Sequence, residues 1–156
     1  MDTTVRERIN AFLAQYDTLA IATVDEGQPY VTRVFYVEEP VNDTALTLYG
    51  TFITTSRKLA NLRHNPNIGL FIGPDQPTIW LEATAQAHVL TDEGAIARVR
   101  QLLAQKSAVA AGFLARVPVA AVQLQVNWLR ITDLTAPPLQ TEVSFAPVDA
   151  GKEEGA

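Results

Sequence analysis

The chain has 156 residues and a formal net charge of −5, which fits a single acidic domain. Hydrophobic residues make up 47% and charged residues 19%, a balance that excludes a disordered chain. Cysteine is absent, which excludes disulfides, thiolate metal sites and cysteine nucleophiles. The acidic balance argues against a nucleic-acid partner, because proteins that bind nucleic acid usually carry a basic face.

The chain also lacks the signals of a membrane or exported protein. It contains no apolar run of the roughly 18 residues that a membrane-spanning helix needs. Its first residues are charged and do not form the apolar stretch of a signal peptide. With two histidines, no cysteine and no carboxylates at metal-ligand spacing, we expect no metal site. These features predict a cytoplasmic protein without a membrane partner.

The N-terminal segment has the apolar spacing of a helix, and Thr4 with Glu7 predicts a capping box at its start. The periodicity then changes to that of strands. Six strands are expected, at Leu19–Val24, Pro29–Val37, Ala45–Thr51, Asn67–Gly73, Thr78–Leu90 and Val119–Leu134. In the last of these the apolar parity shifts by one residue, which predicts a β-bulge near Asn127.

Two further helices are expected between these strands. A short one covers residues 54–64 and stops before Pro66, and a second is capped by Asp92. The alanine-rich stretch Ser107–Arg116 is compatible with helix and with loop. Beyond Pro138 the chain is polar, so residues 1–138 are expected to form the domain and residues 139–156 a dispensable tail.

The sum is a mainly β, α+β chain of about six or seven short strands with a few peripheral helices. Because strands and helices do not alternate, the order does not suit a doubly wound sheet. It predicts a small antiparallel barrel.

The helix start at Ser56, Arg57 and Lys58 is unusual. Cations at a helix N-terminus are unfavourable, since that end carries partial positive charge. Free amides, a hydroxyl and two cations would instead suit a phosphate. The alternative is that both cations point into water. Arg33 interrupts an uncharged strand and either reaches the same anion or covers apolar surface at the rim.

Other polar residues suggest no catalytic constellation. His64 is expected to cap a helix C-terminus, and His88 and Glu82 fall on an exterior strand face. The tyrosines are expected to pack in the barrel. With no nucleophile beside a base and its orienting group, any chemistry is expected to reside in a cofactor.

Two segments resemble those of a known family. Residues 19–24 followed by 27–32 resemble the opening hairpin of the pyridoxamine 5'-phosphate oxidase-like, FMN-binding split-barrel family. Residues 48–51 followed by 56–66, which contain Ser-Arg-Lys and Asn-Pro, are similar to its most diagnostic stretch. The resemblance covers residues 19–91 best and implies a split β-barrel.

The resemblance also implies a set of cofactor-binding residues. Ser56, Arg57 and Lys58 would hold the FMN phosphate. Thr32, Arg33 and Val34 would run beside the flavin, and Gly50 and Thr51 would flank its ribityl–phosphate region. Family sites lie between two copies of the chain, which implies a homodimer that covers Phe35, Tyr36 and their neighbours.

The function implied is an FMN-dependent oxidoreductase acting on a small-molecule substrate. The aligned strand, Thr32–Val37, lacks the leading arginine and the final lysine of the vitamin B6 oxidases. Near the C-terminus only Trp128 and Arg130 suggest their substrate-phosphate cluster. Both departures argue against vitamin B6 oxidation. Alternatives are a non-catalytic flavin- or haem-binding module and a deazaflavin-dependent reductase.

Overall fold

In the computed structural model, which describes residues 1–146, seven strands and four helices follow one another along the chain. Their bounds are α1 Thr3–Leu13, β1 Thr18–Asp25, β2 Gln28–Glu38, β3 Leu46–Ile53, α2 Arg57–His64, β4 Asn67–Ile72, β5 Ile79–Val89, α3 Glu93–Lys106, α4 Ala108–Leu114, β6 Val119–Asp133 and β7 Gln140–Ser144. The expected α+β content and strand number are confirmed. No helix in this part of the chain is long and apolar enough to cross a membrane.

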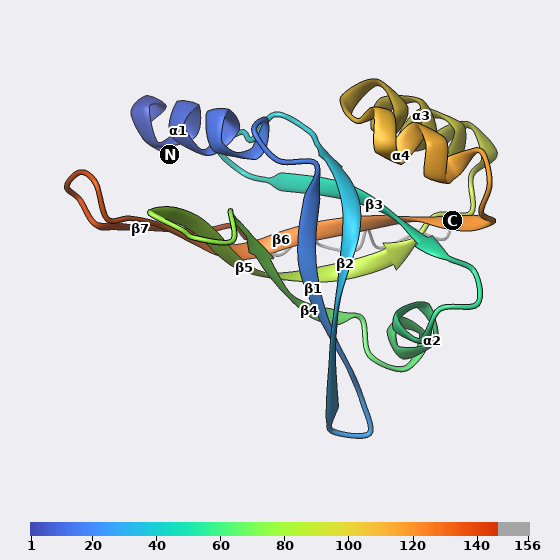
Figure 1. Ribbon diagram of the computed structural model, residues 1–156. Coiled ribbons are helices and arrows are strands. Elements are labelled where there is room, and N and C mark those ends of the chain that lie inside the picture. Colours follow the sequence, from blue (N-terminus) through green and yellow to red (C-terminus); the bar gives the residue numbers. More distant parts are fainter. Residues whose placement is uncertain (147–156) are drawn as a thin grey trace, which may run out of the picture.

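All strand pairs are antiparallel, and the sheet closes on itself. The strand order is β3-β2-β1-β4-β5-β6-β7, and β3 also pairs with β6. Six strands therefore form a closed barrel, and β7 extends it as a seventh strand beyond β6 (Figure 1). The expected bulge is confirmed, because Thr84 pairs with Trp128 and Ala85 with Val126, which leaves Asn127 as the extra residue.

The barrel interior holds the main core. Alternate residues of the strands face inward, as the buried alanines and Leu81 of β5 illustrate. Ile9, Phe12 and Leu13 of α1 join this core. The cap of α1 differs from the expectation, since the Asp2 carboxylate accepts the Thr4 amide at 2.8 Å. Asp2 directly precedes the first helical residue, whereas Thr4, the predicted cap, lies two positions further on and inside the helix.

Helices α3 and α4 lie together on the outside of the barrel (Figure 1). They cover a smaller cluster that includes Val37 of β2 and Ala121 of β6. The ambiguous alanine-rich stretch thus forms helix α4, whose start is capped by the Ser107 hydroxyl. This packing brings the ring of Phe113 to 5.8 Å from that of Phe35.

The segment after Pro138 corrects an expectation. Residues 140–144 form β7, which pairs with β6 over five residues, and Phe145 is buried in the main core. The sequence analysis assigned this segment to a tail because its composition is polar. An edge strand can be largely polar, however, because only alternate residues need to be apolar. The remainder of the expected tail, residues 147–156, lies outside the described residues.

Candidate functional site

The closed barrel is split along part of its wall, where β2 and β3 diverge. These strands pair only from Tyr36 with Gly50 to Glu38 with Leu48. Towards the other end, the facing edges of Thr32–Phe35 and Thr51–Ile53 do not pair with each other, although β2 still pairs with β1 and β3 with β6. Unpaired strand edges offer backbone donors and acceptors to a ligand.

A cavity of about 390 Å³ occupies this opening, which we call the split cleft. Its lining combines apolar and polar side chains from β1, β2, β3, α2 and α4. The lining residues are Thr18, Thr32, Arg33, Val34, Phe35, Thr51, Ile53, Lys58 and Phe113. Five of the eight residues proposed from sequence thus meet here, although they come from three separate segments of the chain.

Lys58 is the buried cation among the residues that line the split cleft. As the second residue of α2 it is buried, with 9% of the residue exposed, and its Nζ lies 5.6 Å from the centroid of the Phe52 ring. No carboxylate within residues 1–146 forms an ion pair with it. Burial lowers the pKa of the Lys58 ammonium, because desolvation disfavours its charged form. A buried cation without a counter-charge suits an anionic ligand.

Two hydroxyl groups near Lys58 also lack partners. Thr51 Oγ1 lines the cleft side of β3 and Ser56 Oγ stands at the N-terminus of α2, and both are buried without a hydrogen bond in the described structure. Ser56 occupies the capping position but its side chain caps no amide. A buried unpaired hydroxyl costs roughly 1–3 kcal/mol. A ligand with several acceptor oxygens would satisfy both hydroxyls and the free amides of the helix.

Three of the predicted residues, Gly50, Ser56 and Arg57, are not among the residues that line the cleft. The exposed Arg57 guanidinium lies over the ring of Tyr30, 5.1 Å from its centroid. Gly50 sits where β2 and β3 part, and a Cβ there would lie 3.3 Å from the Phe52 ring and 3.4 Å from the carbonyl oxygen of Phe35. Its small size therefore lets the two strands approach at the end of the cleft.

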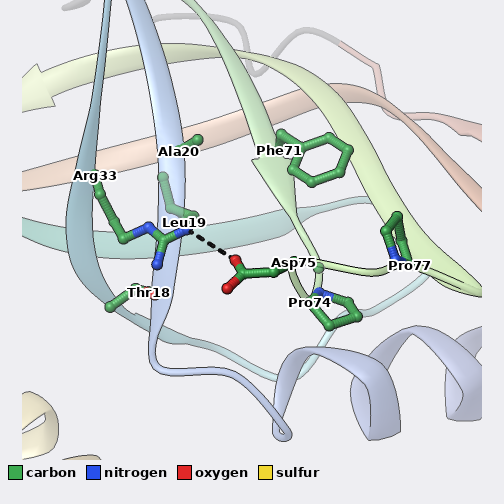
Figure 2. Close-up of a pocket in the computed structure, with 9 residues that line it drawn as sticks. Thr18, Leu19, Ala20, Arg33, Phe71, Pro74, Asp75 and Pro77 are labelled. Carbon is green, nitrogen blue, oxygen red and sulfur yellow. Dashed lines mark ion pairs between the residues drawn. The ribbon is translucent and has the colours of Figure 1, made fainter.

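The Arg33 guanidinium reaches towards the β4–β5 turn (Figure 2). It lies 3.9 Å from Asp75 and lines a second pocket on the outside of β1, as Figure 2 shows. Arg33 thus contributes to the walls of two cavities. Both interpretations of Arg33 from the sequence placed it at one site only. The second pocket becomes visible only in the structure, because the β4–β5 turn that helps to form it is distant in sequence.

The sequence interpretation missed four of the cleft residues, namely Thr18, Phe35, Ile53 and Phe113. Phe113 was hidden in the ambiguous alanine-rich stretch, and it reaches the cleft because α4 packs across β2. The single aromatic residue in an otherwise alanine-rich stretch was the one feature of the sequence that could have indicated a role for Phe113. Tyr36, expected to face a second copy, is instead buried inside its own barrel, where its hydroxyl donates to Leu13 O at 2.8 Å.

Residues set aside from sequence lie away from the cleft. His64 Nδ1 is 3.2 Å from Asp25, at the C-terminal end of α2, and His88 is exposed on β5. Arg130 forms ion pairs with Glu82 and Glu142 across β5, β6 and β7. Its guanidinium is therefore already paired, which argues against a substrate-phosphate role.

A six-stranded antiparallel barrel whose strands β2 and β3 part at one end, with a buried lysine in the cleft between them, defines a split barrel. The model of the pyridoxamine 5'-phosphate oxidase family matches residues 5–134. The chain belongs to this family, as its two diagnostic segments suggested. A comparison with curated proteins gives no match.

Solved structures with the same fold have diverse descriptions. A protein related to general stress protein 26 from Clostridium acetobutylicum, of the pyridoxinephosphate oxidase family, is 13% identical (TM-score 0.68, 92% of this chain and 96% of that one). The haem storage protein HutZ from Vibrio cholerae is 21% identical (TM-score 0.63, 77% and 88%). A haem-binding protein from Mycobacterium smegmatis is 16% identical (TM-score 0.69), and the alignment covers 92% of this chain and 59% of that protein. At these identities the likeness concerns the fold.

Proposed function

We propose that the split cleft binds FMN and that the protein is an FMN-dependent oxidoreductase with a small-molecule substrate. The observation that carries the proposal is a set of unsatisfied groups, of which Lys58 and Thr51 line the cleft and Ser56 stands at the N-terminus of α2. Lys58 lacks a counter-charge, and Thr51 Oγ1 and Ser56 Oγ lack hydrogen-bond partners. A terminal phosphate would supply the charge and the acceptors that all three groups need.

The remaining walls suit the flat ring of a flavin. The strand Thr32–Val34 presents an unpaired backbone edge, which would orient the polar rim of the ring through hydrogen bonds. Phe35 and Phe113 form an apolar wall that would exclude water from one side. FMN, when bound, would supply the electron or hydride transfer, and these residues would position it and shield it.

Haem binding receives less support from this chain. A haem iron needs an axial ligand, and His64 and His88 are the two histidines of the sequence. Neither lines the split cleft, and His64 is held beside Asp25. A deazaflavin coenzyme remains the nearer alternative, because the same unsatisfied groups would hold the anionic part of its tail.

We also propose that the protein is a homodimer formed through the outer face of β2, β1 and β4 on the side nearer the β1–β2 turn. Val31, Ala22 and Gly69 form one row across these strands. Val31 is 66% exposed, and the neighbouring residues are small, so the row is flat and apolar. An outward sheet face is usually polar when it faces water, and a second copy would cover this one.

Titration of the purified protein with FMN, riboflavin, FAD, a deazaflavin coenzyme and haemin tests the cofactor. We expect FMN to bind most tightly, because riboflavin lacks the phosphate and FAD carries a bulky group on it. Flavin fluorescence and absorbance report the binding. Riboflavin affinity equal to that of FMN would contradict the phosphate site, and preferential haemin binding would favour the haem alternative.

A further inference from the structure

A second pocket of about 240 Å³ lies on the outer face of β1, next to the row proposed for the dimer. Leu19 and Ala20 line it on β1, Phe71 stands on β4, and Pro74 and Pro77 come from the β4–β5 turn. Figure 2 shows the Arg33 guanidinium reaching from β2 towards Asp75 of that turn. The pocket therefore combines apolar surfaces with one arginine.

The Arg33–Asp75 contact is weak. The two side chains are 67% and 96% exposed, and the closest charged atoms are 3.9 Å apart. Exposed ion pairs of this kind contribute about 0–1 kcal/mol. Arg33 is the one cation among the residues that line the pocket, and no other carboxylate within residues 1–146 pairs with it. A ligand carboxylate can therefore replace Asp75 at the guanidinium with little loss.

The charge and size of the pocket select a ligand class. One guanidinium beside a carboxylate suits a monoanion and disfavours a dianionic phosphate, since Asp75 would repel the second charge. Carboxylates match the planar fork of arginine. Phe71 and the two prolines offer flat apolar contacts for the rest of the ligand. The volume is smaller than that of typical drug-binding sites, so the ligand is small.

The pocket adjoins the split cleft, because Thr18 and Arg33 line both cavities. We propose that it binds the carboxylate end of a small, flat monocarboxylate substrate beside the cofactor. The assignment as a substrate site rests on the proposed FMN function. The carboxylate recognition itself rests only on the pocket.

Benzoate, with neutral benzamide as its matched probe, tests the proposal by ligand-observed NMR on the protein with and without FMN. We expect benzoate to bind more tightly than benzamide. Arg33→Gln should weaken benzoate binding by about tenfold or more, the effect of losing a charge-assisted pair. Asp75→Asn should tighten it, because the competing carboxylate is removed. Arg98→Gln is the control, since Arg98 is 64% exposed and also pairs with a glutamate.

FMN affinity, measured on the same variants, separates the two proposals. We expect Asp75→Asn to leave FMN affinity within about twofold of wild type, because Asp75 lines the second pocket and is not among the residues that line the split cleft. Benzoate affinity unchanged by Arg33→Gln, or equal for benzoate and benzamide, would overturn the carboxylate site while leaving FMN binding intact. Absence of FMN binding with Arg33-dependent benzoate binding would overturn the proposed function and keep the carboxylate site.

Discussion

Lys58 shows most clearly how a single residue departs from what folding alone favours. Burying an ammonium without a counter-charge costs free energy, and placing it in the first turn of α2 adds an unfavourable dipole interaction. Its neighbour Arg57 has the same charge but is exposed over Tyr30. The contrast between the two cations allows the phosphate site to be tested at one residue.

We expect Lys58→Ala to weaken FMN binding by about 1.5–3 kcal/mol, the range for a charge-assisted hydrogen bond. Riboflavin binding should hardly change, because riboflavin has no phosphate. Arg57→Ala, the matched control, should have a smaller effect on FMN. Fluorescence titration of the three proteins with both flavins measures the difference.

The pH dependence provides a second check on Lys58. Its pKa is lowered by burial, so FMN affinity should fall as the pH rises through that pKa and the cation is lost. Lys58→Ala should lack this fall. If Lys58→Ala weakened the binding of FMN and riboflavin equally, Lys58 would contact the flavin ring or support the fold, and would not hold the phosphate.

At the scale of elements, β7 shows that a polar segment can belong to the folded domain. Its strand pairs with β6 through five residues, and Phe145 enters the core immediately after it. Residues 140–145 therefore belong to the folded domain rather than to a tail that begins after Pro138.

We expect Phe145→Ala to lower the free energy of unfolding by about 3 kcal/mol, the usual cost of removing a buried aromatic ring. Leu139→Ala, at an exposed position just before β7, should change it by less than about 0.5 kcal/mol. Urea denaturation followed by circular dichroism measures both. Equal free energies of unfolding for the two variants would mean that the packing of Phe145 and β7 does not stabilise the domain.

At the scale of the whole molecule, the flat row of Val31, Ala22 and Gly69 is one apolar part of the barrel surface that a single chain leaves open. The β1–β2 hairpin that carries Val31 turns tightly through Glu26 and Gly27, which both have positive φ. The strands are thereby held in one register, and Val31 is fixed on the outer face.

We expect the protein to be a dimer at micromolar concentration and Val31→Asp to convert it to a monomer, because a charge would be buried in the interface. Val109→Asp is the control, since Val109 is 70% exposed but lies on α4. Light scattering coupled to size-exclusion chromatography measures the masses. A monomeric wild type, or equal dimerisation of both variants, would contradict this face.

Local patterns along the chain were sufficient to predict the barrel and much of its detail. Alternation over β5, the parity shift at Asn127 and the cations at the start of α2 are each visible within a dozen residues. Such features arise from strand geometry, helix dipoles and turn chemistry, which act between near neighbours. The Ser-Arg-Lys segment also indicated the cleft through its resemblance to a family.

The tertiary structure decided what depends on residues far apart in sequence. The cleft exists because β2 leaves β3 after Tyr36, and Phe113 joins it because α4 packs on β2. Arg33 lines a second pocket because the β4–β5 turn, about 40 residues further along the chain, packs beside it. Tyr36 lies inside the barrel. Sheet closure and helix docking set these contacts, and they follow from the burial of the whole apolar surface, which no local pattern encodes.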